Sequence, residues 1–340
     1  MFPKVPLILA PTPLHRLANL SERLGFDLWI KRDDLTGFAM GGNKGRKLEY
    51  LIADALREEA DTIVTCGSIQ SNFIRQLGAA CARHGLSCAA AAMSLPYLSP
   101  NEKPDVPGLR PTGGNALLDE WLGVDLRVFP DGTWDDLYAA AKGLADELRQ
   151  AGRKVYEVPV GGSSALGAYA FAQAGKELMD QAAAGFSTEG AESESTATYT
   201  KEFDWILFAS SSGSTHTGLA YAFHGTQTNV LGIACDPEPD LADDFQALYE
   251  KLEALTGQSR PMRRADWRLD FRFVGPGYGI PSEAGRQAIR LMARSEGIFL
   301  DPIYSGKAFA GLLALAEAGE LGGRVLFWHT GGHPALFAME

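Results

Sequence analysis

The chain alternates between amphipathic segments and short apolar runs. One apolar stripe has the i, i+3, i+4, i+7, i+8 spacing of a helix face, and its members are Leu48, Leu51, Ile52, Ala55 and Leu56. Other helices are predicted from about residue 72, over 115–122, from 133 to about 152, after 164 and from about 217. Thr133, followed three residues later by Asp136, resembles a capping box that begins one of them.

Short apolar runs between these helices predict strands over residues 27–31, 62–65, 126–129, 155–160, 205–208, 230–234, 271–274 and 325–328, and a further apolar run covers 88–93. Repeated strand–helix units imply an α/β fold, in which a mostly parallel sheet is covered by helices on both faces. Ligands of such sheets bind beyond the carboxyl ends of the strands. Residues 186–204 are rich in Ser, Thr, Glu and Gly and predict a solvated loop or insertion.

Composition limits the classes of partner. The 340 residues suffice for one large or two ordinary domains, and 46% are hydrophobic and 21% charged, which is ordinary for a globular protein. The formal net charge of -11 argues against a general nucleic-acid or anionic-membrane binder, because those partners require a basic surface. The chain has no run of eighteen apolar residues and no signal-peptide core at its N-terminus.

The four cysteines, Cys66, Cys81, Cys88 and Cys235, form no C-x-x-C pair. No His/Cys spacing suggests zinc, and we expect no metal. A disulfide framework is not expected at this size, so the cysteines indicate a reducing, cytoplasmic setting.

Lys44 is oddly placed, because it opens a helix whose N-terminal partial positive charge repels an ammonium. The two glycines before it lead into the sequence NKGRKLE at 43–49. A bound anion would offset the cost, and so would a neutral lysine used in a Schiff base. A solvated surface lysine after a flexible turn is the simpler reading of this stretch by itself.

Five polar loops carry the remaining signal. They are GNKGRK at 42–47, QSNFIRQ at 70–76, SGSTHTG at 212–218, GYGIP at 277–281 and DPIYSGK at 301–307. Loops rich in Ser, Gly, Asn and Thr at helix N-termini offer hydroxyls and backbone N–H groups. An acidic protein can hold a phosphate in this way without a basic patch.

In this order and at these separations, the loops resemble the family of pyridoxal-phosphate enzymes that includes D-cysteine desulfhydrase and 1-aminocyclopropane-1-carboxylate deaminase. The resemblance runs from about residue 11 to 335. It implies the tryptophan-synthase β-like arrangement, fold type II, with two open, twisted, mostly parallel sheets flanked by helices. We expect residues 48–163 to form a small domain, and residues 1–47 with 164–340 to form the large cofactor-binding domain. The family also implies a homodimer.

The resemblance assigns roles residue by residue. Lys44 is similar to the lysine that bonds covalently to pyridoxal 5'-phosphate. Asn72 is similar to the residue that hydrogen-bonds the cofactor's 3′ oxygen. Lys47 and the serine-rich loop resemble the phosphate cradle, and the cofactor-binding members of that loop are Ser212, Gly213, Ser214, Thr215 and His216.

The same comparison gives Ser71 a place beside the substrate carboxylate. Tyr278 and Tyr304 resemble the tyrosines that flank the substrate and move or share protons. Outside the family context, Ser71 would be a helix cap and the tyrosines would be packed core or rim residues. Neither His216 nor His329 has an evident carboxylate partner, so we expect their imidazoles to be structural.

Two positions distinguish the branches of the family. Where the deaminase pattern has glutamate and leucine, this chain has Ser305 and Thr330, which resembles the desulfhydrase branch. A carboxylate keeps the pyridine nitrogen of the cofactor protonated, and a hydroxyl does so weakly. Opening an unactivated cyclopropane ring should need the stronger electron sink, whereas elimination of a thiol from Cβ needs less.

The resulting hypothesis is α,β-elimination from a small β-substituted amino acid, D-cysteine first, giving pyruvate, hydrogen sulfide and ammonia. Lys44 would be the base, and Ser71 and Tyr278 would hold the carboxylate. Phe73 stands where relatives often have a polar residue, which weakens the choice of substrate. The alternatives are 1-aminocyclopropane-1-carboxylate deamination and a lyase acting on cysteate, D-serine or β-chloro-D-alanine.

Two other protein classes fit the sequence less well. A dinucleotide enzyme would fit the strand–helix rhythm, but no G-x-G-x-x-G follows an early strand. A non-catalytic ligand-binding protein would have no need of Lys44. Neither nucleic acid nor a membrane is an expected partner.

Overall fold

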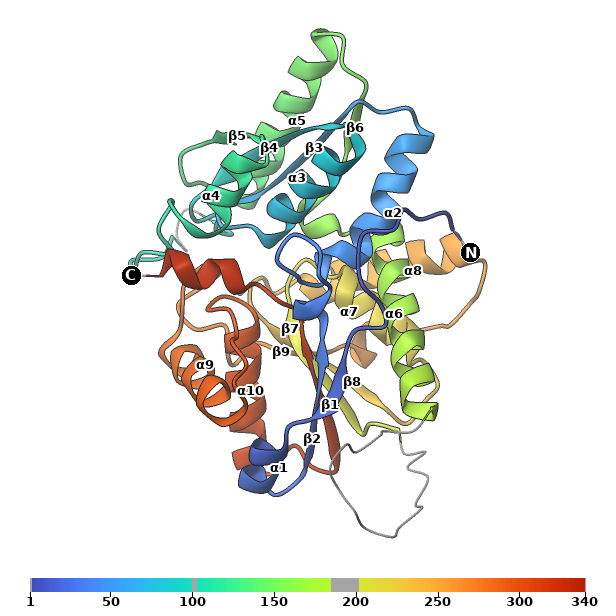
Figure 1. Ribbon diagram of the computed structural model, residues 1–340, viewed down its shortest axis with the longest axis vertical. Helices are drawn as coiled ribbons and strands as arrows, with labels where there is room; N and C mark the ends of the chain where they lie inside the picture. Colours follow the sequence, from blue (N-terminus) through green and yellow to red (C-terminus); the bar gives the residue numbers. More distant parts are fainter. Residues whose placement is uncertain (1, 100–102, 185–201, 340) are drawn as a thin grey trace.

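The structure is a computed structural model that describes residues 2–99, 103–184 and 202–339. The predicted insertion at 186–204 lies mostly outside these residues. The described chain forms two open sheets, one above the other in Figure 1, with helices around both. Among the described residues, no helix is both long enough and apolar enough to cross a bilayer.

The larger sheet has the strand order β1-β2-β10-β7-β8-β9. Its strands are β1 (Leu14–Arg16), β2 (Asp27–Arg32), β10 (Arg324–His329), β7 (Trp205–Ser210), β8 (Asn229–Ala234) and β9 (Arg268–Asp270). All neighbours pair in parallel except β1 and β2. This sheet is therefore parallel with one antiparallel edge strand, close to the prediction.

Helices bury both faces of the larger sheet. Apolar residues of α1 (Ala18–Leu24), α9 (Glu283–Glu296) and α10 (Ser305–Glu317) pack on one face. On the other face lie α6 (Ala165–Ala183) and α7 (Ser214–Ala222), and α8 (Leu241–Thr256) packs against that pair.

The smaller sheet has the order β5-β4-β3-β6 and is parallel throughout. Its strands are β5 (Asp125–Val128), β4 (Ser87–Met93), β3 (Thr62–Ser68) and β6 (Val155–Glu157), and its helices are α2 (Lys44–Arg57), α3 (Asn72–His84), α4 (Gly114–Trp121) and α5 (Trp134–Gln150). Apolar residues of α2 and α3 pack on one face and those of α5 on the other. All four strands lie between residues 62 and 157, and the domain boundaries themselves stay a prediction.

Local sequence signals predicted the first residues of two helices correctly. Helix α2 begins at Lys44, and α5 begins after Thr133, whose hydroxyl accepts a hydrogen bond from the Asp136 N–H while the Asp136 carboxylate accepts one from the Thr133 N–H. The predicted capping box is therefore confirmed.

Three predicted boundaries were wrong. Residues 271–274 form turns rather than a strand, because the Asp270 carboxylate accepts the Arg272 N–H and ends β9 at residue 270. Strand β6 stops at Glu157, since Pro159 has no N–H and leads into a 3₁₀ turn, η3 (Val160–Gly162). Helix α7 begins at residue 214 rather than near 217.

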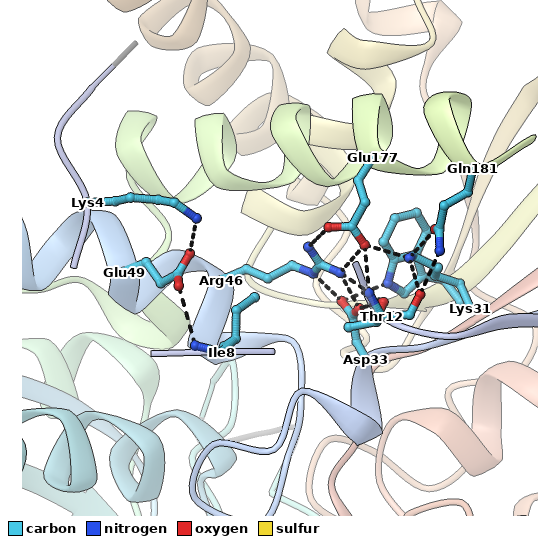
Figure 2. Close-up of polar contacts among 10 residues, drawn as sticks. Lys4, Ile8, Thr12, Lys31, Asp33, Arg46, Glu49, Glu177 and Gln181 are labelled. Carbon is cyan, nitrogen blue, oxygen red and sulfur yellow. Dashed lines mark hydrogen bonds and ion pairs between the residues drawn. The ribbon is translucent and has the colours of Figure 1, made fainter. Parts of the chain in front are cut away.

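A buried network of charges joins α2 to the larger sheet and its helix α6 (Figure 2). The Arg46 guanidinium donates to Asp33 at 2.8 and 2.9 Å and to both oxygens of Glu177 at 2.9 Å. Lys31 donates to Glu177 at 2.6 Å and to the Thr12 carbonyl at 2.7 Å. Two cations thus face two carboxylates, and the bidentate geometry satisfies most of their hydrogen-bonding groups.

The network fixes the direction of α2 at the point where Lys44 emerges. Arg46 lies on the first turn of the helix, Asp33 directly follows β2, and Glu177 lies on α6. One turn further along α2, Glu49 accepts from Lys4 at 2.7 Å and from the backbone N–H of Ile8 at 3.3 Å, so the N-terminal segment is tied across the same helix (Figure 2).

We expect Glu177→Gln to lower the free energy of unfolding at pH 7 by about 3 kcal/mol, because it leaves two buried cations facing one carboxylate. The change is measured by urea unfolding. Asp180→Asn, on the same helix, removes an exposed partner of Lys176 and should cost less than about 0.5 kcal/mol.

The difference should also depend on pH. Burial raises the pKa of Glu177, but Arg46 and Lys31 outweigh it and lower the value from 4.5 to about 2. A carboxylate with a depressed pKa stabilises the fold above its unfolded pKa and loses that contribution as the pH falls towards its folded pKa. The gap between wild type and Glu177→Gln should therefore shrink from pH 4.5 to pH 2, and a constant gap would contradict the assignment.

Candidate active site

A pocket lies where loops of the larger sheet meet α2, α3 and α5 beside the smaller sheet. Its empty volume is about 910 Å³ with the solvent at its open mouth included. Most of the predicted site residues line it, namely Lys44, Ser71, Asn72, Ser212, Gly213, Thr215, His216, Tyr278, Tyr304 and Thr330. Lys47, Ser214 and Ser305 do not line the pocket, and each adjoins a lining residue through a contact or the chain itself.

Two lysines lie side by side at the start of α2, where Lys47 is buried and Lys44 is partly exposed. Burial lowers the pKa of Lys44 to about 8, and the pKa of Lys47 is lowered further by burial and by the charge of Lys44. The Lys47 ammonium donates to the Gly161 carbonyl at 3.0 Å. Within the described ranges neither lysine forms an ion pair with a carboxylate, which leaves this corner suited to an anion and to a neutral amine.

The serine-rich loop begins helix α7 directly beside this corner. The first N–H groups of a helix have no partner within it. That of Ser214 donates to the Ser163 hydroxyl at 3.4 Å, and those of Thr215 and His216 are left to form an anion-binding end. Gly213 has φ +98°, and a Cβ there would lie 2.6 Å from the Phe245 ring. Gly161 has φ +64°, and a Cβ there would lie 2.4 Å from the Ser212 hydroxyl. Both glycines allow the backbone to come close to the pocket.

Hydrogen bonds orient the two polar residues at the start of α3. Ser71 is the N-cap, whose hydroxyl oxygen accepts from the N–H groups of Phe73 and Ile74, so its proton is left to donate. The side-chain oxygen of Asn72 accepts hydrogen bonds from the side chains of Arg75 at 2.9 Å and Asn115 at 3.0 Å. The side-chain N–H groups of Asn72 are therefore left for the pocket. Ser71 is therefore the helix cap and also lines the pocket, whereas Asn72 is not a cap.

The two predicted tyrosines meet at the pocket wall. Their hydroxyls are 2.7 Å apart, so one proton is shared between the two oxygens. Burial raises the pKa of Tyr278 to about 12 and raises that of Tyr304 still further. Both tyrosines are therefore neutral at physiological pH and can donate or accept one hydrogen bond.

Ser305 is engaged by a residue that sequence reasoning missed. Its hydroxyl donates to Asp301 Oδ1 at 2.6 Å and accepts from the Asp301 N–H at 2.8 Å. Asp301 Oδ2 also accepts from the N–H groups of Ile303 and Tyr304, which fixes the first turn of α10. Thr330 lines the pocket directly, next to Gly331, whose carbonyl lies 3.5 Å from the Ser305 hydroxyl.

The two histidines behave differently. His216 is buried among aromatic rings, with Nδ1 3.1 Å from the Ser210 hydroxyl, and burial lowers its pKa to about 3. The expectation that His329 lacks a carboxylate neighbour was wrong, because its Nε2 lies 3.9 Å from Asp34 Oδ2. These two residues lie 295 positions apart in the chain, and no sequence pattern links them.

His333 joins the same cluster, and the ligand atoms of Asp34, His329 and His333 lie within 4.8 Å of one another. The Gly331 N–H donates to Nδ1 of His329 at 3.2 Å, which places the ring proton on Nε2, 2.8 Å from the Phe299 carbonyl. In this arrangement His329 has no lone pair to offer a cation.

Sequence reasoning also missed four residues at the pocket wall: Trp134, Tyr138, Asp236 and Glu238. A signal existed for Asp236, which lies just beyond the carboxyl end of β8, where ligands of parallel sheets bind. The two aromatic residues lie four positions apart on α5 and gave no signal beyond an amphipathic helix.

The donor set fits a phosphorylated aldehyde. A phosphate would match the N-terminus of α7 and the paired lysines, an aldehyde would match the amine of Lys44, and the amide of Asn72 is free to donate to a phenolic oxygen. These matches rest on positive charge without a carboxylate partner and on donors that the described fold leaves available to a ligand.

Comparison with known proteins agrees with this fit. The family model described as pyridoxal-phosphate dependent enzyme matches residues 5–331. The chain is 40% identical to a D-cysteine desulfhydrase of Salmonella choleraesuis strain SC-B67, over 99% of this chain and 96% of the relative. It is 39% identical, with the same coverage, to the D-cysteine desulfhydrase of Salmonella typhi.

Solved structures agree as well. A crystal structure described as an ACC deaminase homologue superposes with a TM-score of 0.82 and 35% identity, over 99% of this chain and 94% of that one. An O-ureido-L-serine synthase superposes with a TM-score of 0.62 and 18% identity, over 96% and 90% of the two chains, which shows a shared fold. The fold-type II architecture predicted from sequence is thereby confirmed. The chain belongs to the family of pyridoxal-phosphate-dependent enzymes.

Proposed function

We propose that this enzyme is a lyase that catalyses α,β-elimination from a small β-substituted amino acid. D-Cysteine is the first candidate substrate, and the products are pyruvate, hydrogen sulfide and ammonia. The names of the relatives that are 39–40% identical over nearly the full chain support this choice. The observation that carries the reaction class is the amine of Lys44 at the pocket wall, whose pKa is lowered to about 8 among neutral hydroxyl donors.

When bound, pyridoxal phosphate supplies an electron-accepting ring that stabilises negative charge at the substrate's Cα. Lys44, Lys47 and the 212–216 loop would hold it, with Asn72 donating to its 3′ oxygen. Lys44 is the candidate base that removes the α-proton, because its own amine is partly neutral near pH 8. The Ser71 hydroxyl, whose oxygen is already used as a helix cap, donates its proton to the substrate carboxylate.

Tyr278 assists in holding that carboxylate, and its hydrogen bond with Tyr304 lets a proton pass between the two oxygens. Ser305 and Thr330 are the proposed neighbours of the pyridine nitrogen. Neither is a carboxylate, so they support a weaker electron sink than glutamate would. A good leaving group at Cβ is consistent with that sink.

Deamination of 1-aminocyclopropane-1-carboxylate is the second candidate, because one structural relative is described as an ACC deaminase homologue. The two are separated by measuring sulfide from D-cysteine and ammonia from 1-aminocyclopropane-1-carboxylate with one preparation. We expect the D-cysteine reaction to exceed the other by at least about a hundredfold in kcat/KM, the range of discrimination that such sites reach. Ammonia release in the absence of sulfide release would overturn the assignment of Ser305 and Thr330.

Lys44→Ala should abolish the visible absorbance band of the lysine-bound cofactor and lower kcat for D-cysteine by at least about a thousandfold, as expected for loss of a covalent and acid–base group. The absorbance spectrum and a pyruvate assay measure these changes. Lys176→Ala, an exposed lysine on α6, is the matched control and should leave both unchanged. An unchanged spectrum in Lys44→Ala would rule out Lys44 as the attachment point.

Cofactor uptake should depend on pH through the same amine. Burial lowers the pKa of Lys44 from 10.5 to about 8, so the reactive neutral amine forms as the pH rises through 8. We expect the rate at which apoenzyme recovers its visible band to rise between pH 7 and 9 and then level off. A rate that continues to rise through pH 10 would show an ordinary lysine instead.

We further infer a cytoplasmic homodimer. Cys66, Cys81, Cys88 and Cys235 are all free and buried, which suits a reducing compartment. The dimer follows the family, and sedimentation velocity of the holoenzyme tests it against a monomer.

A further inference from the structure

Asp236, at the pocket wall, has a carboxylate oxygen that accepts no hydrogen bond from the described residues. It directly follows Cys235 at the carboxyl end of β8, lines the pocket and is only 4% exposed. Within the described part of the chain, its Oδ1 has no hydrogen-bond partner. A buried carboxylate oxygen with no donor is costly, so a donor from the ligand is the natural partner.

Trp134 has the complementary feature, a hydrogen-bond donor without an acceptor in the described part of the chain. Its indole N–H is buried and, among the described residues, has no acceptor. The ring lies 5.3 Å from that of Tyr278 and 6.1 Å from that of Tyr138, both of which also line the pocket. The wall thus contains one acceptor and one donor that the fold leaves unused.

Both groups belong to the surroundings of Tyr278. The charge of Asp236 contributes to the raised pKa values of Tyr278 and Tyr138, and the Trp134 ring packs against those same two tyrosines. Tyr278 is the proposed carboxylate contact, so the wall beside it is where the rest of the substrate would lie.

Resting on the proposed elimination, we propose that Asp236 and Trp134 form the subsite for the substrate's β-substituent. The subsite selects a group that donates one hydrogen bond and accepts another, a thiol or a hydroxyl, and rejects an anionic substituent such as a sulfonate. D-Cysteine and D-serine belong to the accepted class, β-chloro-D-alanine can use only Trp134, and D-cysteate meets repulsion.

The charge environment supports the rejection of anions. Burial raises the pKa of Asp236 to about 6 and that of Glu238, at the half-buried edge of the wall, to about 7. Both carboxyls are therefore ionised at pH 8. Lys307 faces Asp236 from α10, but its ammonium donates to the Gly277 carbonyl at 2.8 Å. Asp240 and Asp244 lie nearby and add negative charge near Glu238.

The test compares substrates within each variant at pH 8, using holoenzyme. Asp236→Asn replaces a charged acceptor with a neutral one, and Trp134→Phe removes the indole donor. In both variants kcat/KM for D-cysteine should fall about tenfold, the loss expected when one buried hydrogen bond is weakened or removed. The value for β-chloro-D-alanine should stay within about twofold in Asp236→Asn, because chloride donates nothing to Oδ1. Asp180→Asn removes an exposed charge on α6, outside the pocket lining, and should change neither.

A binding measurement separates this proposal from the proposed function. Dissociation constants of D-alanine, which has no β-substituent, and of D-cysteate are obtained from the change in the cofactor's visible band. The ratio of D-cysteate to D-alanine constants should fall at least fivefold in Asp236→Asn and stay constant in Asp180→Asn.

The outcomes point in different directions. A parallel loss of D-cysteine and β-chloro-D-alanine activity in Asp236→Asn, or an unchanged binding ratio, would overturn the subsite. Absence of pyruvate from every β-substituted amino acid would overturn the proposed elimination, while the binding ratio would still decide whether Asp236 repels an anion beside Tyr278. Thermal unfolding of each variant, compared with wild type, shows that the loss is not one of folding.

Discussion

The bidentate pairing of Arg46 with Asp33 and Glu177 is the constraint on which the site depends (Figure 2). It joins the first turn of α2, the end of β2 and the middle of α6. With Lys31, which also pairs with Glu177, the cluster holds four charges. Burying them is favourable only when their geometry is good, so this arrangement admits little displacement of α2. Lys44 precedes Arg46 by two residues in the same helical turn, so the network also fixes the position of the Lys44 backbone.

The same helix carries a second electrostatic feature of opposite character. Arg46 has two carboxylates, whereas Lys44 and Lys47 have none within the described residues and are held at depressed pKa values by burial. The fold therefore gives carboxylate partners to the cation that it uses for structure and none, within the described residues, to Lys44 at the pocket wall or to Lys47 beside it. An anionic cofactor would complete the charge balance, and its binding would stabilise the folded state.

Local patterns predicted what depends on neighbours in sequence. The start of α2 at Lys44, the capping box at Thr133 and most strands followed from spacing alone, and the family resemblance supplied most of the pocket residues. The strand expected at 271–274 was wrong because one Asp270 side chain ended β9 early. Some residues are brought to one place only by the fold, and no pattern in the sequence predicts this. Examples are Asp34 and His329, and Asp236 and Trp134, which line the same pocket.

The spacing of Lys44 and Lys47 has a consequence for how this site could change. Each residue of an α-helix advances by about 100° around the axis, so two side chains three positions apart face nearly the same way. Insertion or deletion of a single residue between them would swing one lysine about a quarter-turn away from the other. The length of this helical turn is therefore fixed by the two lysines that it must present together.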